Sequence, residues 1–167
     1  RGVAELAKGM GMEVNAFDPY VSSEDVAELD CLMHDDLDGL FKVCTHISVH
    51  CNLSQDTHHL VNRERLAMMP GIGADGTACG NHVVNCARGG IVDETAILNA
   101  LNSGILSSAA LDVFEVEPAI GNALLQHERF HGSPHIGAAT LEAQTRVGAE
   151  MAGLLSSFFD GDRPVSA

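Results

Sequence analysis

Four polar residues follow segments that are typical of β-strands, and their types could carry chemistry: Asp18, Arg88, Glu117 and His135. A histidine paired with a carboxylate has its imidazolium form stabilised, so His135 beside Glu117 could move a proton near neutral pH. The planar guanidinium of Arg88 suits the carboxylate of a small hydroxy or keto acid. Asp18 could accept hydrogen bonds from ribose hydroxyls and would repel a 2′-phosphate, which favours NAD over NADP.

Each of these residues also has an ordinary structural explanation. Asp18 and His135 both adjoin a proline, as turn residues often do. Arg88 and Glu117 could be ordinary charged residues of the surface. The functional interpretation depends on the fold, because ligands of parallel α/β sheets bind outside the carboxyl ends of the strands. We therefore expect the four residues to meet at that edge of a sheet.

The elements that would position these residues alternate between strand and helix. Strand patterns cover residues 14–17, 31–33, 45–49, 83–85, 108–111 and 129–132, and helical patterns cover residues 2–10, 22–29, 36–41, 62–69, 93–104 and 140–159. Asn62 and Asp93 are candidate N-caps, and Gly104 ends a helix. Alternation with short loops predicts an α/β fold, a doubly wound, Rossmann-type parallel sheet with helices on both faces.

Composition and charge restrict the class of protein. The chain has 167 residues and an apolar fraction of 46%, which suits one globular domain. Nine Lys and Arg against 23 Asp and Glu give a net charge of -14, which opposes binding to nucleic acid or to an anionic membrane. No apolar stretch approaches the length of a membrane span and no leader is visible, so we expect a cytoplasmic protein.

The cysteines carry a further indication of the compartment. There are five, Cys31, Cys44, Cys51, Cys79 and Cys86. Their number is odd, they form no C-x-x-C motif, and most of them stand in apolar runs. This usage predicts reduced thiols that are buried as packing residues, and it does not suit a disulfide framework.

Three long motifs occur in order along the second half of the chain: NCARGGIVDE (85–94), ALDVFEVEP (110–118) and SPHIGAATLEAQ (133–144). They closely resemble the signatures of the D-2-hydroxyacid dehydrogenases. AFDPY (16–20) and VHCNLSQDTHHLVN (49–62) extend the resemblance over nearly the whole chain. The sequence of the first motif looks most like that of the phosphoglycerate dehydrogenases of serine biosynthesis.

The resemblance implies an NAD-dependent oxidoreductase that exchanges a hydride with a small D-2-hydroxy or 2-keto acid. It implies that Arg88 binds the substrate, that Glu117 supports the histidine, and that His135 is the general acid and base. The cofactor contacts that it implies fall on Asp18, Cys51, Cys86, Ala87, Arg88, Asp112, His135, Gly137 and Ala138. The resemblance of the first motif favours 3-phosphoglycerate as the substrate, and glyoxylate, hydroxypyruvate and D-lactate remain alternative substrates. A homo-oligomer, a dimer or a tetramer, is a further implication.

Three features depart from the family pattern. The G-x-G-x-x-G loop and the strand before it are absent, since the chain begins at what looks like the helix after the last glycine, and the flanking substrate domain is absent too. We therefore interpret residues 1–167 as a partial NAD-binding domain whose sheet halves lack a shared neighbour. Residues 71–80 look like an insertion on the side opposite the active site. Asn52 stands where the family usually has proline.

Other interpretations remain open. The same residues would be present in a non-catalytic NAD-sensing protein that resembles the family's transcriptional corepressors. An inactive, truncated relic would also explain the absent loop. His127, His131 and His135 recur every four residues, but Gly132 and Pro134 would break a helix that carried them, so we expect no metal site.

Overall fold

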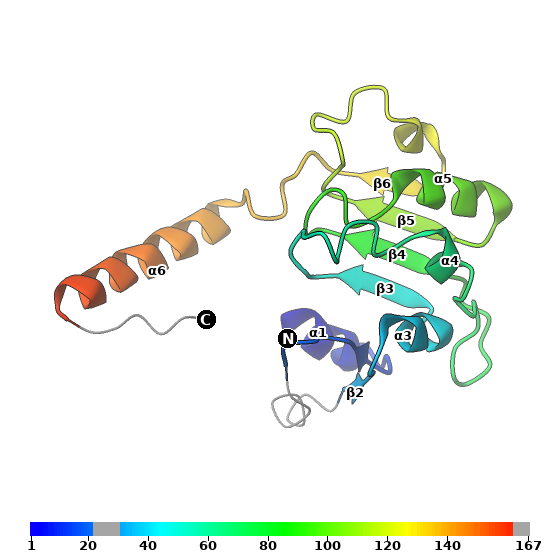
Figure 1. The fold of residues 1–167 in the computed structure, drawn as a ribbon, viewed down its shortest axis with the longest axis horizontal. Coiled ribbons are helices and arrows are strands. Elements are labelled where there is room, and N and C mark those ends of the chain that lie inside the picture. Colours follow the sequence, from blue (N-terminus) through cyan, green and yellow to red (C-terminus); the bar gives the residue numbers. More distant parts are fainter. Residues whose placement is uncertain (22–30, 162–167) are drawn as a thin grey trace.

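The computed structural model describes residues 1–21 and 31–161. The helix expected over residues 22–29 lies outside these ranges. The described residues form two parallel sheets and several helices (Figure 1). The larger sheet has the order β3-β4-β5-β6, built from β3 (His46–Val49), β4 (His82–Asn85), β5 (Ser108–Leu111) and β6 (Phe130–Gly132). The smaller sheet pairs β1 (Asn15–Ala16) with β2 (Leu32–Met33).

The break between the two sheets lies between β1 and β3 in space. None of the described strands joins them, so the doubly wound sheet is interrupted on the described part of the chain. This agrees with the prediction that the two halves lack a shared neighbour. Within the larger sheet the parallel register is regular, with Ile47 opposite Val83 and Val83 opposite Ala109.

The helices begin and end largely where the sequence predicts. They are α1 (Gly2–Gly9), α3 (Leu37–Val43), α4 (Arg63–Leu66), α5 (Glu94–Ser103), the 3-10 helix η1 (Ala123–Gln126) and α6 (Leu141–Phe159). The side chains of Asn62 and Asp93 accept hydrogen bonds from backbone N–H groups of the first turns of α4 and α5, as N-caps do. Gly104 ends α5 with φ of 79°, a left-handed conformation that glycine adopts without strain. Helix α4 is shorter than expected, and η1 was not predicted.

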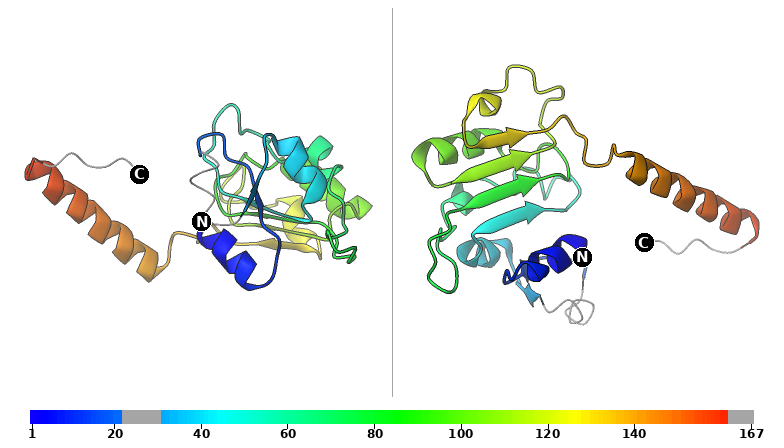
Figure 2. Two further views of the ribbon diagram at one scale, coloured as in Figure 1. Left: turned by 90° about the horizontal axis from the view of Figure 1, so that it is seen from below. Right: turned by 180° about the vertical axis from the view of Figure 1, so that it is seen from behind.

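The larger sheet has one well-covered face. Helices α3, α4 and α5 lie on this face, and α1 lies on the other side near β3 (Figures 1 and 2). Side chains along the strands alternate accordingly, because successive residues of a strand point to opposite faces: Ile47 and Val83 are buried, whereas Ser48 and Val84 are exposed. The expectation of helices on both faces is thus met only in part. Helix α6 extends away from the sheets and has no buried residue (Figure 1).

The core forms between the covered face and its helices. Its largest fully buried side chains include Phe41 before β3, Leu66 of α4, and Ile97 and Leu101 of α5. Burial of such side chains is the main favourable contribution to folding, about 1.5 to 3 kcal/mol each. No helix in the described ranges combines the length and the apolar character that crossing a bilayer would require.

The prediction that the cysteines are buried packing residues is wrong for Cys79 and Cys86 and is met in part for Cys44 and Cys51. None of the five is fully buried, and Cys79 and Cys86 are exposed. Cys79 lies in the loop before β4, and Cys86 is the first residue after that strand, so both are at sheet edges where the chain turns at the surface. Only Cys44 and Cys51 pack against the core.

Residues 71–80 form a small hairpin before β4. Ile72 and Ala78 form an antiparallel bridge, and the Asp75 carboxylate accepts a 2.9 Å hydrogen bond from the Thr77 backbone N–H. The buried side chain of Asn81 holds the base of the hairpin, where its Oδ1 accepts a 2.7 Å hydrogen bond from the Gly71 N–H. The hairpin lies at the amino ends of the strands (Figure 1), which agrees with the side predicted for it.

Candidate functional site

His135 and Glu117 form a close ion pair beyond the carboxyl ends of β5 and β6. The distance from His135 Nδ1 to Glu117 Oε2 is 2.8 Å, and both side chains are partly open to solvent. Glu117 Oε1 accepts a 3.0 Å hydrogen bond from the Phe114 N–H. The hydrogen bond from His135, and then that from Phe114, lower the pKa of Glu117. An Nδ1–H that donates to a carboxylate leaves the Nε2 of the same ring free to exchange a proton with a ligand.

Asp112 anchors the turn that carries His135. This buried residue follows β5 directly, and its Oδ1 accepts hydrogen bonds from Ser133 Oγ (2.5 Å) and from the Ile136 N–H (2.9 Å). Its Oδ2 accepts a 2.7 Å bond from the Gly137 N–H. Burial alone would raise the pKa of Asp112, but these three hydrogen bonds and the charge of His135 outweigh it, so the pKa is lowered. The carboxylate is therefore ionised and fixes a turn in which His135 has φ of 56°.

The turn after β4 presents Arg88. Asn85 is buried and shapes this turn, because its side chain donates to the Arg88 carbonyl and accepts from the Ala87 N–H, both at 2.9 Å. Gly89 then packs so tightly that a Cβ there would lie 1.8 Å from the Phe114 carbonyl oxygen. The turn that carries Arg88 is thus pressed against the loop that carries Glu117. The Arg88 side chain itself is exposed and donates a 2.6 Å hydrogen bond to the Ala87 carbonyl.

Asp18 and Cys51 lie near each other across the gap between the two sheets. Burial, and then the negative charge of Asp18, raise the pKa of the Cys51 thiol. Asp18 is exposed and uses one carboxylate oxygen to accept a 2.9 Å bond from the Tyr20 N–H. His50 also lies at this edge, where burial and then the positive charge of the N-terminus lower its pKa. The amino end of α1 is therefore near the carboxyl end of β3.

The predicted site residues thus form two groups at one edge of the fold. The first group is Arg88, Glu117, Asp112, His135, Gly137 and Cys86, and the second is Asp18 with Cys51. Cys86 belongs to the first group, because its Cβ is 4.0 Å from the position of a Gly137 Cβ and because burial, and then the charge of Asp112, raise its pKa. Ala87 packs against the core, and the Ala138 carbonyl accepts a 3.0 Å bond from Gln144 Nε2.

Two features of this edge were not predicted. The first is the role of Asn85 in shaping the Arg88 turn. A polar residue at the end of an apolar strand is a signal that could have indicated this role. A second histidine–carboxylate pair joins His59 Nε2 to Glu115 Oε1 at 3.0 Å. Nothing local in the sequence indicates that pair, because its members are 56 residues apart.

The donor set fits NAD at the ends of the cofactor that carry its sugars and its nicotinamide. The Asp18 carboxylate is exposed and suits ribose hydroxyls, and the turn at 135–138 lies at the same edge of the strands. Gly71-Ile72-Gly73 lies in the hairpin at the opposite edge, so it does not contribute to this donor set. Among the described residues, no group of three or more His, Cys, Asp and Glu side chains could hold a metal ion.

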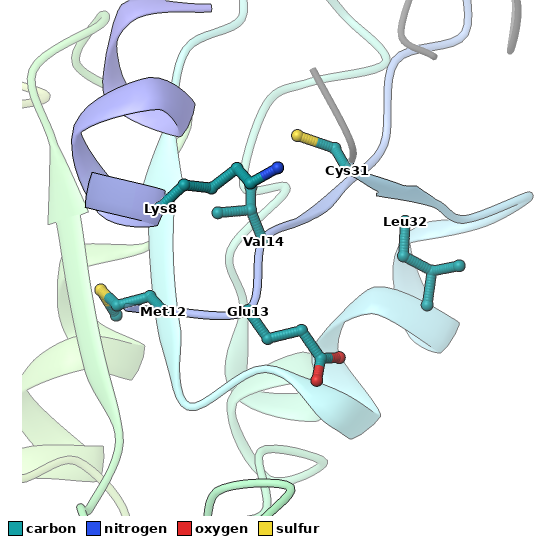
Figure 3. A pocket seen from close by; sticks show the side chains of 6 residues that line it. All are labelled: Lys8, Met12, Glu13, Val14, Cys31 and Leu32. Carbon is teal, nitrogen blue, oxygen red and sulfur yellow. The ribbon is translucent and has the colours of Figure 1, made fainter. Parts of the chain in front are cut away.

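The hollow drawn in Figure 3 is separate from this edge. It is lined by Lys8, Met12, Glu13, Val14, Cys31 and Leu32. Lys8 is near the end of α1, Met12 to Val14 precede β1, Cys31 precedes β2, and Leu32 begins β2, so the hollow lies at the amino ends of the two short strands. The hollow therefore does not include any of the predicted site residues.

Comparison with known proteins agrees with this geometry. Residues 1–137 match the family model of the D-isomer specific 2-hydroxyacid dehydrogenase NAD binding domain. The chain is 37% identical over 165 residues to D-3-phosphoglycerate dehydrogenase of Bacillus subtilis, which covers 99% of this chain and 30% of that protein. It is 42% identical over 152 residues to hydroxypyruvate reductase of Thermotoga maritima, which covers 89% of this chain and 46% of that protein.

Solved structures give the same result. The D-lactate dehydrogenase of Aquifex aeolicus in complex with NAD and lactic acid has a TM-score of 0.76 to this chain at 31% identity, which covers 96% of this chain and 50% of that one. The chain thus spans half or less of the length of these relatives. The family match and the site geometry together lead to one conclusion: the chain belongs to the D-isomer specific 2-hydroxyacid dehydrogenases, and it matches their NAD-binding domain.

Proposed function

We propose that this chain is the cofactor-binding part of an NAD-dependent oxidoreductase that exchanges a hydride with a small D-2-hydroxy or 2-keto acid. The observation that carries the proposal is the 2.8 Å pair of His135 and Glu117, held by Asp112 at the carboxyl ends of the strands. A histidine in such a pair can take a proton from a hydroxyl group and return it to a carbonyl group.

The residues divide the reaction between them. His135 Nε2 removes the hydroxyl proton of the acid, and Glu117 stabilises the imidazolium that results. Arg88 exchanges its contact with the Ala87 carbonyl for two hydrogen bonds to the carboxylate of the substrate. Bound NAD would supply the acceptor for the hydride that leaves C2 of the substrate. Asp18 favours NAD over NADP because its charge repels a 2′-phosphate.

We further propose that the substrate is 3-phosphoglycerate and that the enzyme acts in serine biosynthesis. The 37% identity to D-3-phosphoglycerate dehydrogenase supports this substrate. The 42% identity to hydroxypyruvate reductase makes hydroxypyruvate the main alternative substrate. We further propose a cytoplasmic homo-oligomer in which residues 1–167 are part of a larger cofactor domain.

The test is turnover by the full-length protein, including whatever precedes Arg1. NADH oxidation is followed with a panel of 2-keto acids that contains phosphohydroxypyruvate, hydroxypyruvate, glyoxylate and pyruvate. His135→Asn and Arg88→Ala should each abolish turnover. His131→Asn is the matched control, since His131 is an exposed histidine of the neighbouring strand β6. Asparagine is chosen at 135 because it tolerates the left-handed backbone.

Each outcome is informative. Turnover that is lost in both variants and kept in the control supports the proposal, and the fastest keto acid names the substrate. NADH binding without turnover would contradict the proposal and favour a non-catalytic sensor. Neither binding nor turnover would favour a relic.

A further inference from the structure

His59 contacts both segments that carry the proposed reaction. Its backbone N–H donates a 2.9 Å hydrogen bond to the carbonyl of Gly90, in the turn that presents Arg88. Its Nε2 lies 3.0 Å from Glu115 Oε1, in the loop that carries Glu117. His59 has φ of 50°, a left-handed conformation that non-glycine residues adopt rarely. This backbone conformation therefore accompanies a side chain that reaches across to a second segment.

Glu94 holds the same loop from the other side. It is the first residue of α5, and its Oε1 accepts a 2.6 Å hydrogen bond from the Glu115 N–H. Its Oε2 accepts a 2.5 Å bond from Asn122 Nδ2. One carboxylate therefore ties both ends of residues 115–122 to the start of a helix, and Glu117 lies between the two ties.

Helix α5 is itself a fixed support. Asp93 caps it, and the Asp93 N–H donates a 2.9 Å bond to the carbonyl of Val61. The Val61 N–H in turn bonds the carbonyl of Ile91 at 3.1 Å, and both of these apolar residues are fully buried. The loop with Glu117 is thus anchored to the core through Glu94, whereas the carboxylates of Glu115 and Glu117 remain partly open to solvent.

We propose that His59 and Glu94 are positioning residues, which converge on Glu115 and thereby set the place of Glu117 and the orientation of His135. His59 also couples the Arg88 turn to this loop, so the group that binds the carboxylate and the group that moves the proton are aligned together. The expected effect on kcat rests on the proposed function, because it requires turnover. The expected effect on the position of Glu117 and His135 does not depend on turnover.

The variants are chosen to keep the backbone and remove single contacts. His59→Asn keeps a residue that tolerates the left-handed backbone but is too short to reach Glu115. His59→Gln retains an amide N–H that can replace Nε2. Glu94→Gln loses the charge and one of two acceptors. His58→Asn is the matched control, since the His58 ring stacks on His59 at 3.9 Å and has no polar side-chain partner in the described structure.

Two measurements are made on the full-length protein. Hydrogen exchange of residues 112–122, together with the side-chain nitrogen resonances of His135, reports the loop and the pair without any substrate. Steady-state kinetics report kcat and the KM for NADH. A displacement of about 1 Å at a reacting group can cost on the order of a hundredfold in rate, so we expect kcat to fall roughly tenfold to a hundredfold in His59→Asn and Glu94→Gln, with the KM for NADH changed less than about twofold.

The expected pattern has three parts. Exchange in residues 112–122 rises and the His135 Nδ1–H signal weakens in His59→Asn and Glu94→Gln, while His59→Gln recovers most of both and His58→Asn changes neither. Unchanged exchange and an unchanged His135 signal in His59→Asn and Glu94→Gln would overturn the inference, as would an equal effect of His58→Asn. If the wild-type protein has no turnover, the proposed function fails, and the exchange and resonance data alone decide the inference.

Discussion

Replacing Asp112 with asparagine should cost far more stability than the change of one atom suggests. The carboxylate accepts hydrogen bonds from Ser133, Ile136 and Gly137. An asparagine can turn its oxygen toward Ser133 and Ile136, but its NH2 group then faces the Gly137 N–H at 2.7 Å, donor against donor. The lost charged bond is worth about 2 kcal/mol, and the two remaining bonds weaken by about 1 kcal/mol each when they become neutral.

The sum is a loss of about 4 kcal/mol in the free energy of unfolding. With an m value of about 2 kcal/mol/M, the midpoint of urea unfolding should fall by about 2 M, measured by circular dichroism on the full-length protein. Asp75→Asn is the control, because the Asp75 carboxylate also accepts two hydrogen bonds from Thr77 but lies in an exposed hairpin. That variant should shift the midpoint only slightly. A shift of less than about 0.3 M for Asp112→Asn would refute the claim that this carboxylate anchors the turn.

The stabilising effect of the Asp112 carboxylate should depend on pH in a defined direction. The pKa of Asp112 is lowered from 3.8 by folding, so its contribution to stability is present above pH 3.8 and is lost as the pH falls through the lower folded value. The difference in unfolding free energy between wild type and Asp112→Asn should therefore be largest at neutral pH and should shrink below pH 3.8. A difference that stays constant down to pH 2 would contradict the assignment.

Three further predictions test the packing of the site and of the larger sheet. Gly89→Ala places a Cβ 1.8 Å from the carbonyl oxygen of Phe114, so it should destabilise the fold by about 2 kcal/mol or more in urea unfolding, and an unchanged midpoint would show that the turn is not packed there. Burial, and then the charge of Glu13, raise the pKa of Cys44 to about 11, so little of its reactive thiolate is present at pH 8. Mass spectrometry after maleimide treatment at pH 8 should therefore find Cys44 unmodified and the exposed Cys86 labelled, and labelling of Cys44 without Cys86 would contradict the fold. Asn81→Ala removes a buried side chain that bonds the Gly71 N–H and the Ile105 carbonyl, so it should lower the free energy of unfolding by about 2 to 3 kcal/mol. A decrease of less than about 0.5 kcal/mol would contradict this role of Asn81.

Much of the sheet could be predicted because its signals are local. Strands such as β5 contain short apolar runs, and helix ends are marked by residues with a defined capping function, such as Asn62, Asp93 and Gly104. The pairing of Glu117 with His135 was also predicted, and the structure places the two within hydrogen-bond distance. That prediction depended on the expected fold, since the two residues lie 18 positions apart in different loops and only a shared sheet edge would bring them together.

The features that escaped prediction depend on contacts between distant loops. The pair of His59 and Glu115 forms because the Arg88 turn and the loop after β5 pack together, which no periodicity in either segment reveals. Helix η1 is only four residues long, and its one signal is the Asn122 cap. The exposure of Cys79 and Cys86 was missed because an apolar neighbourhood in the sequence does not say on which side of a turn a side chain emerges.

The hairpin of residues 71–80 has a consequence for how such a protein can change over time. Its connection along the chain to the residues that could do chemistry is β4, a strand of four residues that is held in register by a neighbour on each side, and Asn81 at its base also bonds the Ile105 carbonyl just before β5. Four residues of strand span about 13 Å, so length changes at one end leave the geometry at the other end intact. Genetic drift can thus lengthen, shorten or recode this hairpin while selection acts on the opposite rim, and variation in its length among relatives would carry no information about substrate choice.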